Sequence, residues 1–435
     1  MRWLLIVSVF GSSASAAEPV WADARVATFA QYFQQALLPG QPGVVGQLES
    51  AFPVTLNASL RFGGVDLFGA PDVVSGEVAA WGSLGPRDGR NVDADVTSAW
   101  AMYRNGALRV KLGRQVALPG ASRYVRFDGA SLGIRAGPID VEAYGGFVAL
   151  PRWNQPRGAT VLGFVGDGLD NPLLLEAQNR AGHFTLGARV TATLPLEGRL
   201  AAGFHEQHDQ VGVAFRVLSV DGALRPVPWL GLGARASIDL TSLAPAEARA
   251  WIDVTRLTNV PVSVDYVYQR PALLLPRSSV LAAFGGDPWH ELGAETSVRA
   301  LESLTVTGRG AVQFFDDARY GGRGQLGFRW RPVLDGRVTV LGQFARVLVP
   351  PSGYVQGRLG ARWLVTPAWT ATLDGAVYVY DVPVRGVPVS LTAIGSVEWL
   401  ARPWLRAMLS ATAMRTPWAA FELQGLARIV VEFGS

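Results

Sequence analysis

The sequence predicts an all-β protein, a transmembrane antiparallel β-barrel of about 22 strands. Apolar and polar residues alternate over successive segments of roughly ten to fourteen residues, which is the two-residue period of a β-strand. Gly, Pro, Asp or Asn bounds these segments, as expected for turns between strands. Charged residues are 17% of the chain, where roughly 25% is usual in soluble domains. Beyond the N-terminal segment no uninterrupted apolar run of about 18 residues occurs, so membrane helices are not expected.

The N-terminus has the pattern of a cleavable secretory signal. Arg2 precedes the apolar stretch Trp3–Phe10, and an A-x-A site follows at Ala14–Ala16. We therefore expect residues 1–16 to be a signal peptide and residues 17–435 to form a single transmembrane barrel domain. The chain contains no cysteine, which excludes a lipoprotein anchor and a disulfide framework.

The first segment of the mature chain, Ala24–Leu38, has an ambiguous pattern. Its apolar residues would also form one face of a helix, at Val26, Phe29, Phe33 and Leu37. The predicted strand number depends on this segment, because single-chain bacterial barrels have an even number of strands. A strand here gives about 22, whereas a periplasmic helix would leave roughly 18 or 20. From Phe52 onward the alternation is clear.

The predicted connections fall into two classes that alternate along the chain. The short turns are Asn105-Gly106, Gly137-Pro138, 195–198, 259–261, 300–303, 332–336, Thr366-Pro367 and Arg402-Pro403. The longer links, rich in Pro, Gly and charge, are 114–124, 150–176, 270–289 and 316–322. Outer-membrane barrels have short periplasmic turns and longer extracellular loops, so we assign the two classes to these two rims. Loops 150–176 and 270–289 are long enough either to fold inward and narrow the channel or to remain exposed for recognition.

Tryptophans recur beside the short turns. Trp229, Trp369 and Trp404 each follow one, and Trp363 and Trp399 each precede one. Trp is enriched where a protein meets the interface between membrane and water. The pattern therefore predicts an aromatic girdle at the periplasmic rim.

The last predicted strand, Trp418–Phe433, alternates between apolar and polar residues over most of its length. One face carries Phe421, Leu423, Gly425, Ala427, Ile429, Val431 and Phe433, and the other carries Glu422, Gln424, Arg428 and Glu432. An apolar face and a charged face suit a wall between lipid and a wet lumen. The terminal aromatic resembles the insertion signal of bacterial outer-membrane barrels, although Gly434 and Ser435 follow it. We therefore expect the barrel-assembly machinery to be a partner of this strand.

If apolar positions face lipid, two charged sets face the lumen. The predicted basic set is Arg309, Arg323, Arg329, Arg358 and Arg362, and the predicted acidic set on the preceding strands is Asp253, Asp265, Glu291 and Glu295. A basic stripe beside an acidic stripe would create a transverse field that orients polar solutes. Alternatively, the charges pair across strands and hydrate the lumen.

Two short stretches resemble a known family. Leu112-Gly113-Arg114-Gln115 and Arg126-Phe127-Asp128-Gly129 are similar to the G-R-Q and F-D-G pattern of alginate-export-type porins. The resemblance implies a basic lumen that passes an anionic polysaccharide or another solute. Signal, strands, turns and closing strand together resemble the Gram-negative outer-membrane porin-like barrels more broadly.

The expected function is an outer-membrane channel, a porin or passive transporter for small polar or anionic solutes. The sequence leaves open a structural or assembly barrel that sheathes or anchors a partner protein. We expect outer-membrane lipid and lipopolysaccharide around the wall. The solute and the oligomeric state are not determined by the sequence.

We do not expect an enzyme, a metal site or a cofactor. The stretch His205-Glu206-Gln207-His208-Asp209 lacks the H-E-x-x-H spacing that places two metal ligands on one helical face. It also falls in a predicted hairpin tip, where polar residues are common. The net charge is only +4 and the basic residues are dispersed through strands, so nucleic-acid binding is not expected either.

Overall fold

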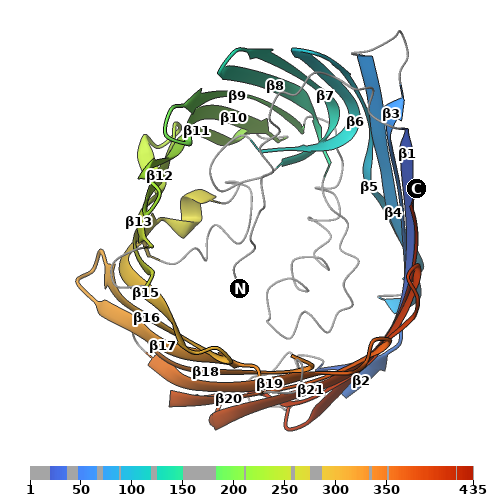
Figure 1. Cartoon of the computed structure of the whole chain (residues 1–435), viewed down its shortest axis with the longest axis vertical. Helices are drawn as coiled ribbons and strands as arrows, with labels where there is room; N and C mark the ends of the chain where they lie inside the picture. Colours follow the sequence, from blue (N-terminus) through green and yellow to red (C-terminus); the bar gives the residue numbers. More distant parts are fainter. Residues whose placement is uncertain are drawn as a thin grey trace.

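The computed structural model of the chain is a closed ring of antiparallel β-strands, seen end-on in Figure 1. It describes residues 20–36, 48–65, 72–87, 90–118, 125–149, 183–209, 212–255, 260–274, 287–332, 336–349, 352–417 and 419–434. The predicted signal peptide, residues 1–16, lies outside the described residues. No helix among the described residues is both long enough and apolar enough to cross a membrane.

The strands follow one another around the ring in chain order. They are β1 (Trp21–Ala36), β2 (Leu48–Ala51), β3 (Val54–Val65), β4 (Asp72–Arg87), β5 (Arg90–Asn105), β6 (Leu108–Ala117), β7 (Val125–Ala136), β8 (Ile139–Val148), β9 (Phe184–Leu194), β10 (Gly198–His208), β11 (Val213–Val227), β12 (Leu230–Asp239), β13 (Ala244–Val254), β14 (Val262–Gln269), β15 (Trp289–Leu301), β16 (Leu304–Phe315), β17 (Tyr320–Trp330), β18 (Val338–Val349), β19 (Ser352–Thr366), β20 (Trp369–Val384), β21 (Val387–Arg402), β22 (Leu405–Arg415) and β23 (Glu422–Gly434). Among the described residues β2 pairs only with the end of β1, so the wall itself has 22 strands, as predicted.

β1 closes the ring. It pairs antiparallel with β23, from Asp23 opposite Gly434 to Tyr32 opposite Gly425, and also with β3. The ambiguous segment Ala24–Leu38 is therefore a strand over most of its length. The helical alternative is wrong, because the backbone of this segment pairs with both β23 and β3. Closure leaves no free edge in the wall, which removes the site where sheets otherwise aggregate.

Apolar side chains face outward and polar ones face the lumen. In β23, the outward Phe433 is 57% exposed, whereas the inward Glu422 is only 2% exposed. Exposed outward leucines follow the same rule on the other strands, for example Leu60, Leu373 and Leu409. This arrangement is the inverse of a soluble protein and is typical of a wall surrounded by lipid.

The two rims of the ring differ as predicted. The first residues of β1 and the last of β23 lie together at one rim, which we call the terminal rim. The strand ends that flank the eight predicted short turns lie at the terminal rim, and those that flank the four predicted longer links lie at the opposite one, the loop rim. Not every connection at the loop rim is long, because only two residues, Arg385 and Gly386, join β20 to β21.

Outward aromatic side chains mark both rims. At the terminal rim Trp369 stacks on Trp399 with ring centroids 5.6 Å apart, and Trp404 stacks on Phe433 at 6.1 Å. The predicted girdle also includes Trp229 and Trp363, which are exposed. The loop rim carries a second exposed band at Phe147, Phe184, Phe314, Tyr320 and Phe421. Two aromatic bands with an apolar surface between them are typical of a membrane-spanning barrel.

One part of the wall bends toward the interior, near β6 and β7 in Figure 1. Three glycines lie opposite one another along this bend, in the order Gly113, Gly129 and Gly146. Gly113 has a φ of 110°, a conformation that side chains disfavour, and a Cβ there would lie 2.2 Å from the Ala99 carbonyl oxygen. The bend lets inward side chains form a small buried core of Ala117, Val125, Phe127 and Tyr144.

Arg114 ties this bend to the neighbouring strand. Pairing between β5 and β6 ends at Ala99 and Arg114. The Arg114 guanidinium donates to both Asp128 carboxylate oxygens, at 2.6 and 2.8 Å, and to the Val96 carbonyl at 2.6 Å. Asp95 accepts from Arg114 and from Arg126, each at 3.1 Å. The residues that carry the family resemblance are therefore engaged in holding three strands together.

The closing strand gives a first test of the lipid-facing surface. Ile429 is exposed on the outward face near the middle of β23. We expect Ile429→Arg to lower the free energy of unfolding by about 2 to 4 kcal/mol, since that is the cost of a cation at the lipid midplane. Denaturant-dependent unfolding in lipid vesicles measures it. Gln424→Arg on the inward face is the control, and an equal loss in both variants would contradict the assignment of the two faces.

Candidate functional site: the lumen wall

The charged side chains of the lumen wall are the candidate site. The register of β13 to β19 puts all nine predicted residues on the inward face, as the pairing of Glu295 with Arg309 and of Gln343 with Arg358 illustrates. Asp253 is on β13, Asp265 on β14, Glu291 and Glu295 on β15, Arg309 on β16, Arg323 and Arg329 on β17, and Arg358 and Arg362 on β19. Their side chains are, however, not arranged as two separate stripes.

Five of them form one charged cluster: Asp265, Glu291, Glu295, Arg309 and Arg323. Arg309 donates to both oxygens of Asp265, at 2.7 and 3.1 Å, and to Glu291 Oε1 at 3.0 Å. Glu295 lies 3.6 Å from Arg309, and Arg323 also donates to Glu291 Oε1. The cluster therefore links four consecutive strands, β14 to β17.

A glycine makes this linkage possible. Asp265 and Arg309 are on strands that are not neighbours, and Gly293 of β15 lies between them. A Cβ at position 293 would lie 2.8 Å from Arg309 Nη2 and 3.2 Å from Asp265 Oδ1. The guanidinium thus occupies the space of the missing side chain, where it reaches over β15.

Burial makes the pairing in the cluster energetically important. Glu291 is 1% exposed and Asp265 is 3% exposed, so both carboxylates have lost most of their contact with water. Glu291 also accepts a hydrogen bond from Gln313 at 2.8 Å, which satisfies its second oxygen. Buried ions are tolerated when they are paired and hydrogen-bonded in this way. Three carboxylates and two guanidiniums give the cluster a net charge of −1, so it stabilises the wall and does not present a free basic surface.

The remaining predicted residues differ in pairing. Arg358 binds Asp374 of β20 at 2.9 Å. Arg329, Arg362 and Asp253 form no ion pair within the described part of the chain. A third arginine, Arg299 of β15, lies opposite Thr305, and Thr305 lies opposite Arg329. We call Arg299, Arg329 and Arg362 the arginine band; all three are exposed on the lumen face, near the terminal rim.

Several residues of this wall were not predicted. Asp374, Gln313, Gly293 and Arg299 all lie at inward positions. Alternation within each strand was a usable signal for Asp374 and Arg299. The part played by Gly293 depends on the register of three strands, for which a single sequence carries no signal.

The histidine-containing stretch is divided between the two faces of β10. His205 is buried on the inward face, with Nδ1 2.8 Å from the Tyr144 hydroxyl. His208 is on the outward face, where it stacks on Phe184 and contacts Glu206. Among the described residues there is no group of three or more His, Asp or Glu that could hold a metal ion.

The sequence left open whether the two long loops, 150–176 and 270–289, narrow the lumen. Residues 150–176 lie outside the described residues. Of 270–289, the short 3-10 helix η2 (Pro271–Leu274) is described, and Figure 1 shows it inside the ring of strands. Residues 275–286 are not described.

Comparison with known proteins yields structural likenesses only. No protein-family model and no curated protein matches the chain. Among solved structures, it is similar to the P pilus usher PapC translocation pore, with a TM-score of 0.45, 8% identity, and coverage of 95% of this chain and 99% of that one. It is also similar to the outer membrane protein OpdK from Pseudomonas aeruginosa (TM-score 0.42, 10% identity, 95% and 99% coverage) and to OccK2 (OpdF) from the same organism, solved with glucuronate (0.40, 12%, 95% and 97%). At this distance the functional argument rests on the barrel itself.

Proposed function

We propose that the chain is an outer-membrane channel, a porin or passive transporter for small polar or anionic solutes. The observation that carries the proposal is the inverted wall: a closed ring of 22 strands with exposed apolar side chains outside and charged ones inside. A barrel of this size has a lumen wide enough for water. The aromatic bands at both rims support insertion across a bilayer.

The terminal rim is proposed to face the periplasm. The first residues of β1, the last of β23 and the strand ends that flank the predicted short turns lie there, which is the usual orientation of outer-membrane barrels. The chain would reach this membrane through its signal peptide and would be inserted by the barrel-assembly machinery acting on β23. Lipid and lipopolysaccharide then surround the wall.

A mild preference for anions follows from the distribution of charge. The charged cluster and the pair Arg358–Asp374 largely neutralise themselves. The arginine band has no such partners in the described part of the chain, so it supplies fixed positive charge to the lumen near the terminal rim. Fixed positive charge raises the local concentration of anions within a Debye length, about 10 Å at 0.1 M salt.

Planar-bilayer recording of the purified protein tests both statements. We expect steady conductance and, in a salt gradient, a reversal potential displaced toward that of the anion. Arg329→Gln with Arg362→Gln should reduce the displacement, and the difference between wild type and variant should shrink as salt rises. The control, Arg358→Gln with Asp374→Asn, removes a matched pair and should leave the reversal potential nearly unchanged.

The same recording separates the channel from the alternative. An open double variant with unchanged selectivity would show that the arginine band is remote from the narrowest part of the lumen. Folded protein that conducts no ions would instead favour a barrel that sheathes or anchors a partner protein.

A further inference from the structure

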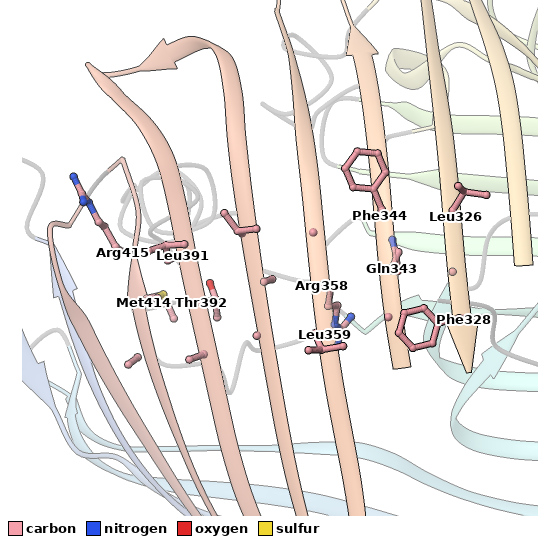
Figure 2. Close-up of a pocket in the computed structure, with 18 of the residues that line it drawn as sticks. Leu326, Phe328, Gln343, Phe344, Arg358, Leu359, Leu391, Thr392, Met414 and Arg415 are labelled. Atoms are coloured by element: carbon pink, nitrogen blue, oxygen red, sulfur yellow. The ribbon is translucent and has the colours of Figure 1, made fainter. Parts of the chain in front are cut away.

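The outward face of β16 to β22 contains a large apolar groove. Its volume is about 1090 Å³, and its floor includes Gly342, Gly357 and Gly375 on three consecutive strands. Bulky outward side chains stand beside the floor, among them Phe344, Leu359 and Leu391, as Figure 2 shows. At Gly375 the space is open, because the nearest atoms to a Cβ there would be carbonyl oxygens at 3.8 and 4.0 Å. The volume exceeds the roughly 300 to 1,000 Å³ typical of small-molecule pockets.

The loop-rim end of the groove is positively charged. Arg415, the last residue of β22, lines the groove, is exposed, and forms no ion pair within the described residues. Figure 2 shows its guanidinium beyond Leu391, the residue opposite Arg415 in β21. Arg346 of β18 lies on the same outward face, two residues beyond Phe344, and binds Asp381 at 2.6 and 2.8 Å. Because Asp381 compensates the charge of Arg346, the net positive charge at this end of the groove comes from Arg415.

These charges are unusual for a surface that faces lipid. An outward arginine costs least at the level of the lipid headgroups, near the end of a strand. Arg415 is the last residue of β22 and Arg346 is three residues from the end of β18, so both lie toward the loop rim. An apolar trough below a cationic end matches an amphiphile with acyl chains and an anionic head.

We propose that this groove binds the phosphorylated, acylated glycolipid of the outer leaflet, with acyl chains against the glycine floor and a phosphate at Arg415. The inference rests on the proposed orientation, which places the loop rim in the outer leaflet. Guanidinium groups bind phosphate through paired, charge-assisted hydrogen bonds, and a neutral headgroup would not be held in this way. Burial of acyl methylenes in the groove adds affinity in proportion to chain length.

The test measures retention of purified diphosphoryl lipid A by the full-length barrel, using native mass spectrometry in detergent. Wild-type protein should retain lipid A in preference to its dephosphorylated form. Arg415→Gln should weaken lipid A binding about tenfold or more. Gly375→Phe, which fills open space in the groove, should also weaken it while the barrel stays folded.

Arg329→Gln is the matched control, because it removes one exposed arginine from the lumen face and should leave lipid A binding unchanged. Equal binding of lipid A by wild type and both groove variants would overturn the proposal, as would equal binding of the dephosphorylated form. Groove variants that change only the mass of the oligomer would identify a second copy of the chain as the occupant and would also overturn it. Channel function is measured separately, as conductance in planar bilayers, and the groove variants should retain it.

Discussion

The Gly129→Val substitution is expected to prevent assembly of the barrel. A Cβ at position 129 would lie 2.1 Å from the Gly145 carbonyl oxygen and 2.6 Å from the Gly146 Cα. Both contacts are with backbone, so no side-chain rotation relieves them, and β7 would have to separate from β8. Such a separation disrupts the ladder that carries the bend and the small core around Phe127.

Outer-membrane fractionation and migration on unheated detergent gels measure the result, since a closed barrel resists detergent until it is heated. Gly310→Val in β16 is the control, because nothing lies within 4 Å of a Cβ there. Gly129→Val should be absent from the membrane fraction, whereas Gly310→Val should behave as wild type. Normal heat-dependent migration of Gly129→Val would show that β7 and β8 lie farther apart than the structure places them.

The contrast between these two glycines shows what a single sequence can predict. Glycine in a strand indicates a bend or a close approach of backbones, but not which of the two, nor where. Gly113, Gly129 and Gly146 become important only because they are opposite one another in three strands. The register between strands is not local information. The direction of each side chain is local, since it follows from alternation within one strand.

The difference between local side-chain direction and non-local strand register also decides what could be predicted for the lumen wall. Asp265, Glu291 and Arg309 lie on the face of their strands that alternation assigns to the lumen. Alternation did not predict that Arg309 binds Asp265, because the two residues are 44 positions apart and are brought together across β15 by Gly293. Arg114 is a similar case. The pattern around it resembles a porin motif, but its hydrogen bonds to Asp128 and to the Val96 carbonyl depend on how the strands pair, which the sequence does not show.

The second large effect is expected at Arg309. Arg309→Leu removes the partner of Asp265 and one of two guanidiniums that bind Glu291, and these carboxylates are 3% and 1% exposed. Breaking a buried ion pair from one side costs about 3 to 5 kcal/mol, because an uncompensated charge remains. We therefore expect the free energy of unfolding to fall by about that amount. Denaturant-dependent unfolding in lipid vesicles measures the change.

Two further variants test whether burial of the carboxylates causes the loss expected for Arg309→Leu. Arg358→Leu breaks the pair with Asp374, whose side chains are 50% and 28% exposed, so the expected loss is below about 1 kcal/mol. Combining Arg309→Leu with Asp265→Asn should recover part of the loss, because the buried charge that lost its partner is then removed as well. Equal losses for Arg309→Leu and Arg358→Leu, with no recovery in the combined variant, would mean that lumen water reaches Asp265. The cluster would then be a hydrated part of the channel surface, and its carboxylates would oppose the anion preference of the arginine band.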